Sequence, residues 1–319
     1  MRAPHPLILT VTGLAACAGL AACAGLAACA SPATEPATPA RAPATPASVA
    51  HTAAPVPPAP PAPALARSTA TTPPPQSALE VGVTRAHVTV GGADLVPVPT
   101  APAWVDGFAV AHKRGGPHDL FVVPLGRAVE AARAGRTTAA LRVAPEIPYR
   151  VLVEVLFTLA QSGVPKVAML VTGAGGGLAT IEHEAPRAAP GDLAAQAEAM
   201  AAELAVLGGG SRTAGAHAAP SGSPAFVTIA RDGLTVRAGG VKLGPGCRGP
   251  GQGPTVPALP SSEQDWASLG RCAATLRADA GAGDTITLTA APEIDFQTVV
   301  STLDAVRPSF PRFTLGVPR

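Results

Sequence analysis

The chain has 319 residues, including 37 Pro and 34 Gly but only 7 Phe, 2 Trp and 1 Tyr. This length allows about two domains of ordinary size, but a chain so rich in Pro and Gly is not expected to fold throughout. Its formal net charge of +2 excludes a typical nucleic-acid-binding protein, because phosphate contacts need clustered Lys and Arg.

The first 30 residues have the pattern of an export signal. Residues 1–6 carry one Arg and no acid, and residues 7–30 carry no charge. The sequence Leu-Ala-Ala-Cys recurs three times in this apolar run and ends at Cys17, Cys23 and Cys29. Each copy resembles a bacterial lipobox, whose Cys is acylated and becomes the mature N-terminus. Cys23 leaves a leader of typical length and is the preferred lipid attachment site, with Cys17 and Cys29 as alternatives.

The same run is also long enough to span a bilayer as an uncleaved helix. Both interpretations place the rest of the chain outside the cytoplasm, because Arg2 favours the cytoplasmic side. We therefore expect a membrane-anchored lipoprotein of the bacterial cell envelope that faces the periplasm.

A tether is predicted next, over residues 31–78. Residues 31–76 contain 14 of the 37 Pro, interleaved with Ala, Thr and Ser. Such a composition cannot bury enough apolar surface to offset the entropy lost on ordering, so we expect a disordered, extended segment.

An internal repeat dominates the remainder. Ala-Pro-Glu-Ile-Pro-Tyr at residues 144–149 recurs as Ala-Pro-Glu-Ile-Asp-Phe at residues 291–296. Each copy follows an apolar strand pattern, residues 138–143 and 285–290, and precedes a helical pattern and a final strand. The apolar positions expected on the two helix faces are Val151, Val155, Leu156 and Leu159 in the first copy and Val299, Val300, Leu303 and Val306 in the second.

These patterns predict an α+β fold made of two tandem modules. Module 1 covers residues 79–172 and module 2 covers residues 225–319. Each module is expected to carry a β-sheet with two helices on one face. Residues 173–224 are expected to be a flexible linker that contains one Ala-rich helix, over residues 192–207.

The order of elements resembles the periplasmic domain of the ExbD/TolR family of biopolymer-transport proteins. In module 2 the resemblance lies in residues 226–236, 285–290 and 295–306, and in module 1 in residues 148–156 and 162–167. It implies self-association and contact with the cell wall or with envelope proteins. Family members also have a transmembrane helix with an Asp that serves proton-driven energy transduction, but residues 7–30 contain no Asp or Glu. An ion-translocating role is therefore not expected.

Two cysteines lie beyond the export segment, Cys247 and Cys272, both in module 2. An even pair in an exported protein favours a disulfide, and two free buried thiols are the alternative. Cys272 stands in the first helix of module 2, where module 1 has Ala128.

Candidate chemical sites are few. The glycine run at residues 173–177 lacks the Lys and Ser/Thr of a phosphate-binding loop, so we interpret it as a flexible segment. His112, His118 and His183 have no metal-ligand spacing and are interpreted as solvated loop residues. Glu146 and Glu293, just ahead of a helix in each module, are expected to stabilise the helix N-terminus rather than to catalyse.

The sequence thus predicts no catalytic, cofactor-binding or metal-binding residues. We expect a non-enzymatic envelope lipoprotein that binds an envelope protein or peptidoglycan, contacts the membrane through an N-terminal lipid or helix, and is capable of self-association. The alternative is an accessory subunit of an ExbD/TolR-type transport complex, anchored by an uncleaved N-terminal helix.

Overall fold

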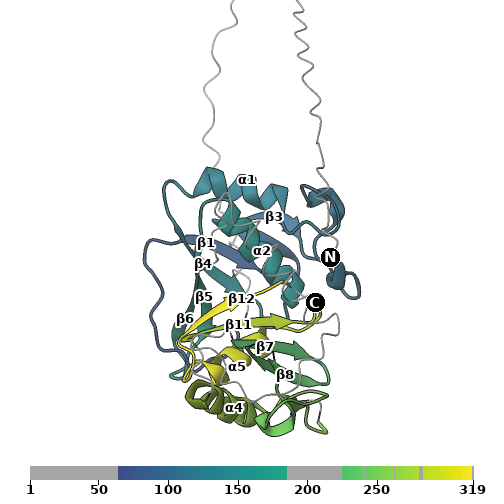
Figure 1. The fold of residues 1–319 in the computed structure, drawn as a ribbon. Coiled ribbons are helices and arrows are strands. Elements are labelled where there is room, and N and C mark those ends of the chain that lie inside the picture. The colour runs from purple at the N-terminus through teal and green to yellow at the C-terminus, as the bar shows by residue number, and fades with distance from the viewer. Residues whose placement is uncertain (1–63, 185–224, 240, 262, 280–282, 318–319) are drawn as a thin grey trace, which may run out of the picture. The chain divides into compact units, whose positions relative to one another are not determined.

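The described part of the chain combines helices with two β-sheets, each of which contains both parallel and antiparallel strands (Figure 1). The computed structural model describes residues 64–184, 225–239, 241–261, 263–279 and 283–317. All of them belong to the unit formed by residues 60–319. The mixed composition is consistent with the predicted α+β class.

The first sheet consists of β1 (Leu79–Val83), β2 (His87–Val90), β3 (Ala93–Pro97), β4 (Thr138–Val143), β5 (Lys166–Thr172) and β6 (Leu178–Glu184). Their order across the sheet is β3-β2-β1-β4-β5-β6. The pairs β1–β4 and β4–β5 are parallel, and the remaining pairs are antiparallel. The parallel pairs require crossover connections, which is where the helices of this half lie.

The second sheet consists of β7 (Ala225–Ala230), β8 (Gly233–Ala238), β9 (Val241–Lys242), β10 (Val256–Pro257), β11 (Thr285–Ala290) and β12 (Arg312–Leu315). Its order is β10-β8-β7-β11-β12, and β9 pairs with β8. The pairs β7–β11 and β11–β12 are parallel, whereas β7–β8 is antiparallel. Strands β8, β7, β11 and β12 therefore follow the same arrangement as β2, β1, β4 and β5. The predicted strands at residues 138–143 and 285–290 are confirmed as β4 and β11.

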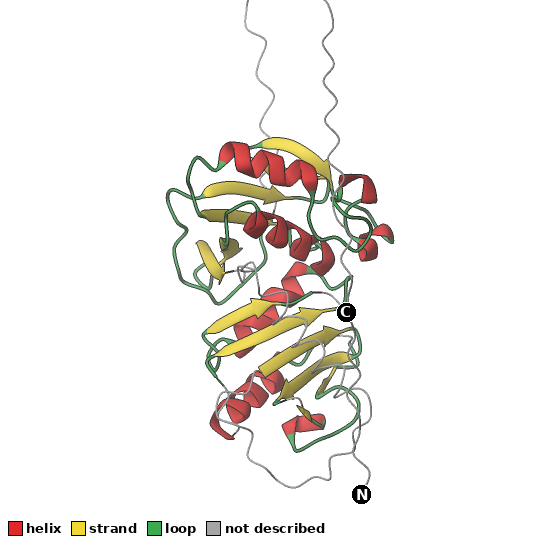
Figure 2. Ribbon diagram, turned by 45° about the horizontal axis from the view of Figure 1, so that its top comes forward, coloured by secondary structure: helices red, strands yellow, loops and turns green. Residues whose placement is uncertain are grey.

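The described helices are α1 (Val123–Ala132), α2 (Tyr149–Gln161), α4 (Trp266–Asp279) and α5 (Phe296–Val306), with short 3₁₀ turns η1 (Ala103–Asp106), η2 (Val110–His112) and η3 (Pro245–Cys247). They are drawn in red in Figure 2. Helix α1 packs against α2, and α4 packs against α5. The eight apolar positions predicted for the helix faces of α2 and α5 are all buried, which confirms that pattern.

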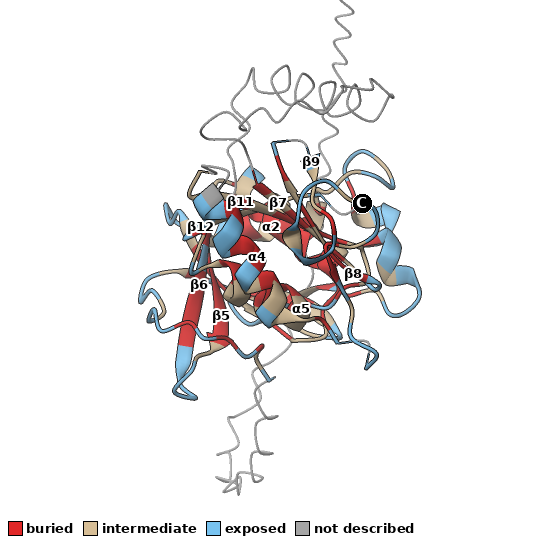
Figure 3. Ribbon diagram, turned by 60° about the horizontal axis from the view of Figure 1, so that its bottom comes forward, coloured by how far each residue is buried: buried red, intermediate tan, exposed pale blue. Residues whose placement is uncertain are grey.

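Burial follows the alternation of strand residues. In β7, Ala225, Val227 and Ile229 are buried while the residues between them are partly exposed. The central strand β4 buries Ala139, Ala140, Leu141 and Val143, as expected for a strand with neighbours on both sides. Figure 3 shows buried residues concentrated in the strands and helices and exposed residues in the loops.

The two repeated Ala-Pro-Glu-Ile segments pair with each other through backbone hydrogen bonds. Pro148 and Asp295 form an isolated antiparallel bridge. The four bonds are reciprocal, so that equivalent residues exchange roles: Tyr149 N–H to Ile294 O (2.7 Å), Phe296 N–H to Ile147 O (2.8 Å), Arg150 N–H to Pro292 O (3.1 Å) and Gln297 N–H to Pro145 O (2.9 Å). A reciprocal pattern of this kind is what a two-fold axis between like surfaces produces.

Two segments that the sequence assigned to connections take part in this structure. Residues 64–72, at the end of the predicted tether, bury Ala66 and Ala70, and the backbone of residues 66–68 bonds to Thr172 at the end of β5. Strand β6 lies within the range assigned to the linker. It pairs with β5 along its whole length, although its sequence ends in Glu-His-Glu.

Candidate functional site

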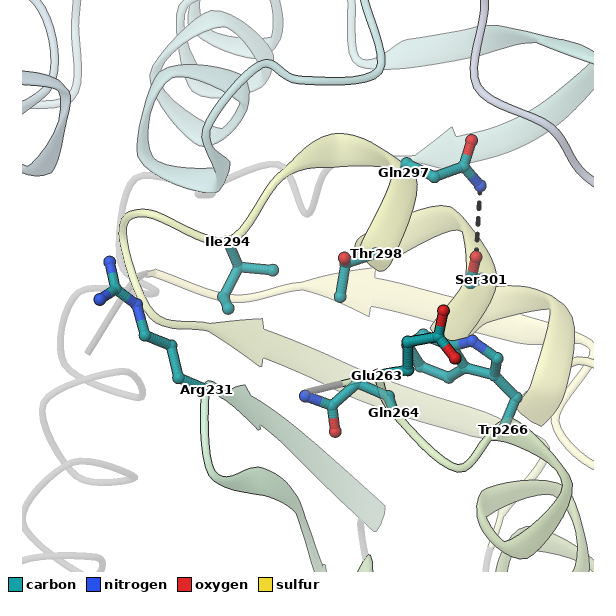
Figure 4. Close-up of a pocket in the computed structure, with 8 residues that line it drawn as sticks. All are labelled: Arg231, Glu263, Gln264, Trp266, Ile294, Gln297, Thr298 and Ser301. Carbon is teal, nitrogen blue, oxygen red and sulfur yellow. Dashed lines mark hydrogen bonds between the residues drawn. The ribbon is translucent and has the colours of Figure 1, made fainter. Parts of the chain in front are cut away.

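A pocket of about 680 Å³ opens in the second half of the chain, where α4 and α5 begin (Figure 4). Arg231 lies at one end and Trp266 and Glu263 at the other, with Ile294 and Thr298 between them. The complete lining is Arg231, Glu263, Gln264, Trp266, Ile294, Gln297, Thr298 and Ser301. It combines one aromatic ring, one aliphatic side chain and a majority of polar groups.

Gln264 is the most distinctive residue of the pocket. It is only 9% exposed, and its Nε2 donates to the Ala230 carbonyl at 3.1 Å. Its Oε1 has no hydrogen-bond partner among the described residues. A buried acceptor without a partner loses free energy relative to its hydrated state, so nearly all such groups in proteins are paired. Gln264 therefore places an unpaired, buried acceptor in the wall of the pocket.

Trp266 is placed by the start of α4. Asp265 precedes it and accepts a hydrogen bond from the Ser268 N–H at 2.9 Å, which caps the helix. The Ser268 hydroxyl also donates to Asp265 and is the main cause that lowers the pKa of this carboxyl. A half-buried indole held at a capped helix start offers a rigid apolar surface together with one N–H donor.

The charged groups at the pocket rim largely compensate one another. Arg231 Nε lies 3.0 Å from Glu293 Oε1, and this pair is open to solvent on the arginine side. The lining contains no His or Cys, and the Ser301 hydroxyl has Gln297 Nε2 as its neighbour at 3.2 Å. Gln297 cannot act as a base toward that hydroxyl, and the lining carries one positive and one negative side chain, Arg231 and Glu263.

Gln297 already holds a piece of peptide backbone beside the pocket. Its Oε1 accepts from the Arg67 N–H at 2.7 Å, and its Nε2 donates to the Arg67 carbonyl at 3.0 Å. Further along α5, Asp304 accepts from the Ser68 hydroxyl and the Thr69 N–H, both at 2.8 Å. One side of α5 is thus occupied by residues 67–69 of the same chain.

The cysteines predicted from sequence fall in two regions. Cys17, Cys23 and Cys29 lie outside the described residues. Cys247 and Cys272 lie at disulfide distance, with their Cα atoms 5.5 Å apart. They line a second pocket, of about 420 Å³, together with Arg248, Thr255 and Asp265 and other residues of that loop and helix.

Both repeated glutamates pair with an arginine of the strand hairpin in their own half. Glu146 pairs with Arg85, and Glu293 with Arg231. Neither glutamate caps a helix as predicted, because residue 148 is the N-cap of α2 and at α5 the side chain of Asp295 accepts the Thr298 N–H at 2.7 Å. Each glutamate lies two residues before the N-cap, and its carboxylate pairs with the hairpin arginine.

The histidines differ from one another in exposure. His118 is exposed and His112 partly exposed, as predicted for loop residues. For His183 the prediction is wrong, because it is 4% exposed in β6 and its ring stacks on Phe313 at 5.7 Å. Its Nδ1 has no hydrogen-bond partner within the ranges that the structure describes. Residues 173–177 connect β5 to β6 as a hairpin loop, in which the Gly173 N–H bonds to the Gly177 carbonyl.

Sequence reasoning missed the pocket and one buried ion pair. Lys113 Nζ lies 2.8 Å from Glu154 Oε1, and both side chains are fully buried. Trp266 offered a signal, since it is one of only two Trp in a chain poor in aromatics. Glu154 also offered a signal, because it is the one acidic residue inside the apolar run of residues 151–157. Gln264 offered none, because its burial depends on distant strands.

Within the described ranges, no helix is both long and apolar enough to cross a membrane. The same ranges contain no group of three or more His, Cys, Asp or Glu side chains arranged to hold a metal ion. Comparison with known proteins gives no match to a family model, to a curated protein or to a solved structure.

Proposed function

We propose that the chain is a non-enzymatic binding lipoprotein of the bacterial cell envelope, built from two tandem ExbD/TolR-like modules. Its ligand is an envelope protein or peptidoglycan. The observation that carries a binding role is the pocket at Trp266, where the buried Gln264 Oε1 lacks a partner beside polar side chains that include no catalytic pair.

Three repeated features support tandem modules, each a sheet covered on one face by two helices. The strand arrangement around β1 and β4 matches that around β7 and β11. The ion pair of Arg85 with Glu146 has its counterpart in Arg231 with Glu293. The backbone bonds between the two Ala-Pro-Glu-Ile segments are reciprocal. Duplication followed by pairing within one chain accounts for all three, and it would make the self-association implied by the resemblance internal to the chain.

Photo-crosslinking in intact cells tests the binding role. A photoreactive amino acid in place of Trp266 is expected to yield a crosslinked species that the same group at Val241 does not yield. Val241 is a suitable control because it is exposed on β9 in the same module and lies outside the pocket. Digestion with a muramidase or with a protease then identifies the attached material as peptidoglycan or protein. Equal crosslinking from both positions would contradict a specific site.

Mass spectrometry of the mature N-terminus tests the anchor. The lipobox-like repeats lead us to expect an acylated Cys23, or Cys17 or Cys29 in its place. An intact, unacylated Met1 would contradict the lipoprotein and would favour the accessory transport subunit with an uncleaved helix.

A further inference from the structure

The pocket side of α5 has a counterpart in module 1. Aligned on the shared Ala-Pro-Glu-Ile segment, Gln297 and Ser301 correspond to Arg150 and Glu154. Both pairs make the same contact across one helical turn. Gln297 Nε2 lies 3.2 Å from Ser301 Oγ, and Arg150 Nε lies 2.7 Å from Glu154 Oε1. The two helix faces can therefore be compared position by position.

In module 1 the chain's own loop covers this face. Residues 98–122 run from β3 to α1, and within them the Phe108 N–H donates to Glu154 Oε2 at 2.8 Å. Lys113 Nζ donates to Glu154 Oε1 at 2.8 Å and to the carbonyls of Asp106 and Pro117. Phe108 is 1% exposed. A peptide thus lies across the helix, gives a backbone N–H to a buried side-chain acceptor, and buries an aromatic ring beside it.

In module 2 the corresponding connection, residues 243–265, includes the short strand β10, and its last residues line the pocket without closing it. Ser301 is too short to provide the acceptor that Glu154 provides, but Gln264 Oε1 supplies a buried acceptor in the same pocket. Trp266 and Ile294 add apolar surface to this pocket. The open pocket therefore combines a buried acceptor with apolar surface, the two features that the loop of module 1 meets or buries at the equivalent helix.

Peptide backbone is also what α5 binds on its neighbouring side. The amide of Gln297 pairs with both backbone groups of Arg67, and Asp304 receives the Thr69 N–H. Both segments in contact with this pair of equivalent helix faces are extended or irregular peptide. Neither contact resembles the recognition of a sugar, which requires donors and acceptors matched to hydroxyl groups.

Resting on the proposed binding function, we infer that the Trp266 pocket takes a short peptide segment of a protein partner. A backbone N–H of that segment donates to Gln264 Oε1, and an aromatic or branched apolar side chain lies against Trp266 and Ile294. The near-neutral rim selects no strong net charge in the ligand.

A library of random short peptides displayed on phage, selected on the full chain under oxidising conditions, provides the probe. We expect enriched peptides to share an aromatic or branched apolar residue. Ser301→Trp fills the pocket and is expected to weaken an enriched peptide by about tenfold or more, the effect of losing one well-formed buried hydrogen bond and its apolar contact. Trp266→Ala provides a second variant at a partly exposed position. Val241→Trp, outside the pocket, should leave the affinity unchanged.

Each variant is compared only after its urea unfolding midpoint matches that of the parent chain. If neither Ser301→Trp nor Trp266→Ala changes the affinity for an enriched peptide, the inference is overturned. Failure to enrich any peptide would also overturn it. If the crosslinking at Trp266 instead captures peptidoglycan, the peptide inference falls while the proposed binding function stands. If Trp266 crosslinks to nothing that Val241 does not, both fall.

Discussion

The two proposed modules, residues 79–172 and 225–319, each hold a connecting segment in place through a different link. Each has a long irregular connection between its strand hairpin and its first helix, residues 98–122 in module 1 and residues 243–265 in module 2. In module 1 the connection is held by the buried pair of Lys113 and Glu154. In module 2 it is held where Cys247 meets Cys272. The connection of module 1 also buries Phe108, whereas residues 244–260 of module 2 are rich in Gly and Pro, so the link matters most where apolar anchors are few.

The point of attachment decides which surface is left open. Glu154 lies on α2, the second helix of its module, so the loop drawn toward it covers that helix. Cys272 lies on α4, the first helix of its module, so the loop drawn toward it leaves the equivalent face of α5 uncovered. The difference between a closed and an open site thus follows from the position of one linking residue rather than from a different fold.

The largest effect is expected from breaking the link in module 1. Lys113→Met leaves the Glu154 carboxylate buried with fewer donors, and loss of one partner of a buried ion pair costs about 4 kcal/mol of unfolding free energy. Urea unfolding of the full chain measures it. Ser301→Ala, at the position equivalent to Glu154, is the matched control and should change stability by less than about 0.5 kcal/mol.

The double variant Lys113→Met/Glu154→Leu removes both charges and should recover much of the loss, because two apolar side chains can replace a buried pair. A double variant that is less stable than Lys113→Met alone would show that Arg150 and the Phe108 N–H still depend on the carboxylate.

Next comes the link in module 2. Closing a ring over the sequence separation of 25 stabilises the folded state by about 3.5 kcal/mol through loop-closure entropy. Reductant, or Cys272→Ala to match Ala128 of module 1, should therefore lower the unfolding midpoint of the full chain. Amide exchange should quicken first in residues 243–260, while β4 in module 1 keeps its protection. Titration that finds Cys247 and Cys272 both free in the native protein would rule the bond out.

Local signals in the sequence led to the strands and helices that carry the repeat. Strands β4 and β11 and the buried faces of α2 and α5 could be predicted because their periodicity and the Ala-Pro-Glu-Ile segment are local. The pairing of Cys247 with Cys272 could also be predicted, because they are the two cysteines beyond residue 30, and their Cα atoms lie 5.5 Å apart.

The pocket and strand β6 could not be predicted in the same way. Gln264 packs against a strand that is distant in sequence, and its side-chain Nε2 donates a hydrogen bond to the Ala230 carbonyl. His183 and its flanking glutamates resemble a solvated loop, and only pairing with β5 makes them a strand with His183 facing inward. Glu146 and Glu293 were identified as equivalent, but the arginines that pair with them lie on another part of each module. Each of these features depends on contacts between distant segments.

A pH-dependent effect follows from β6, a strand present only in the first sheet. Burial lowers the pKa of His183 to about 4. In the unfolded chain this histidine binds a proton near pH 6.5, whereas in the folded chain it stays neutral down to about pH 4. The free energy of unfolding should therefore fall as the pH drops from about 6.5 to about 4, by up to about 3 kcal/mol. The charged groups around it are Glu182 and Glu184 on its own strand, Lys166 on β5 and Arg312 on β12.

His183→Leu should flatten that pH dependence, whereas His118→Leu, at an exposed loop position, should leave it unchanged. Unfolding of both variants at pH 7 and at pH 4.5 separates the histidine from the neighbouring carboxylates. Equal slopes in all three proteins would assign the acid sensitivity to Glu182 and Glu184 instead.

The smallest effect concerns one of the two positions at which the repeated six-residue segments differ. Tyr149 follows the first and Phe296 the second. The Tyr149 hydroxyl lies 3.0 Å from the Leu288 carbonyl and 2.7 Å from the Gly316 carbonyl, both in module 2. Burial raises the pKa of this phenol well above its ordinary value, so it remains a neutral donor at any physiological pH.

Tyr149→Phe places the same residue at this position in both segments and removes only that donor. The Leu288 carbonyl keeps the Gly316 N–H at 2.8 Å, so one acceptor alone loses its partner and the cost should be about 1 kcal/mol. Urea unfolding gives the total, and amide exchange near Leu288 and Gly316 shows whether the loss is felt in module 2. Tyr149→Leu also removes the ring and should cost several times more. Equal stability of Tyr149→Phe and the parent chain would show that water replaces the hydroxyl at Gly316 and that this hydroxyl does not help to hold the two segments together.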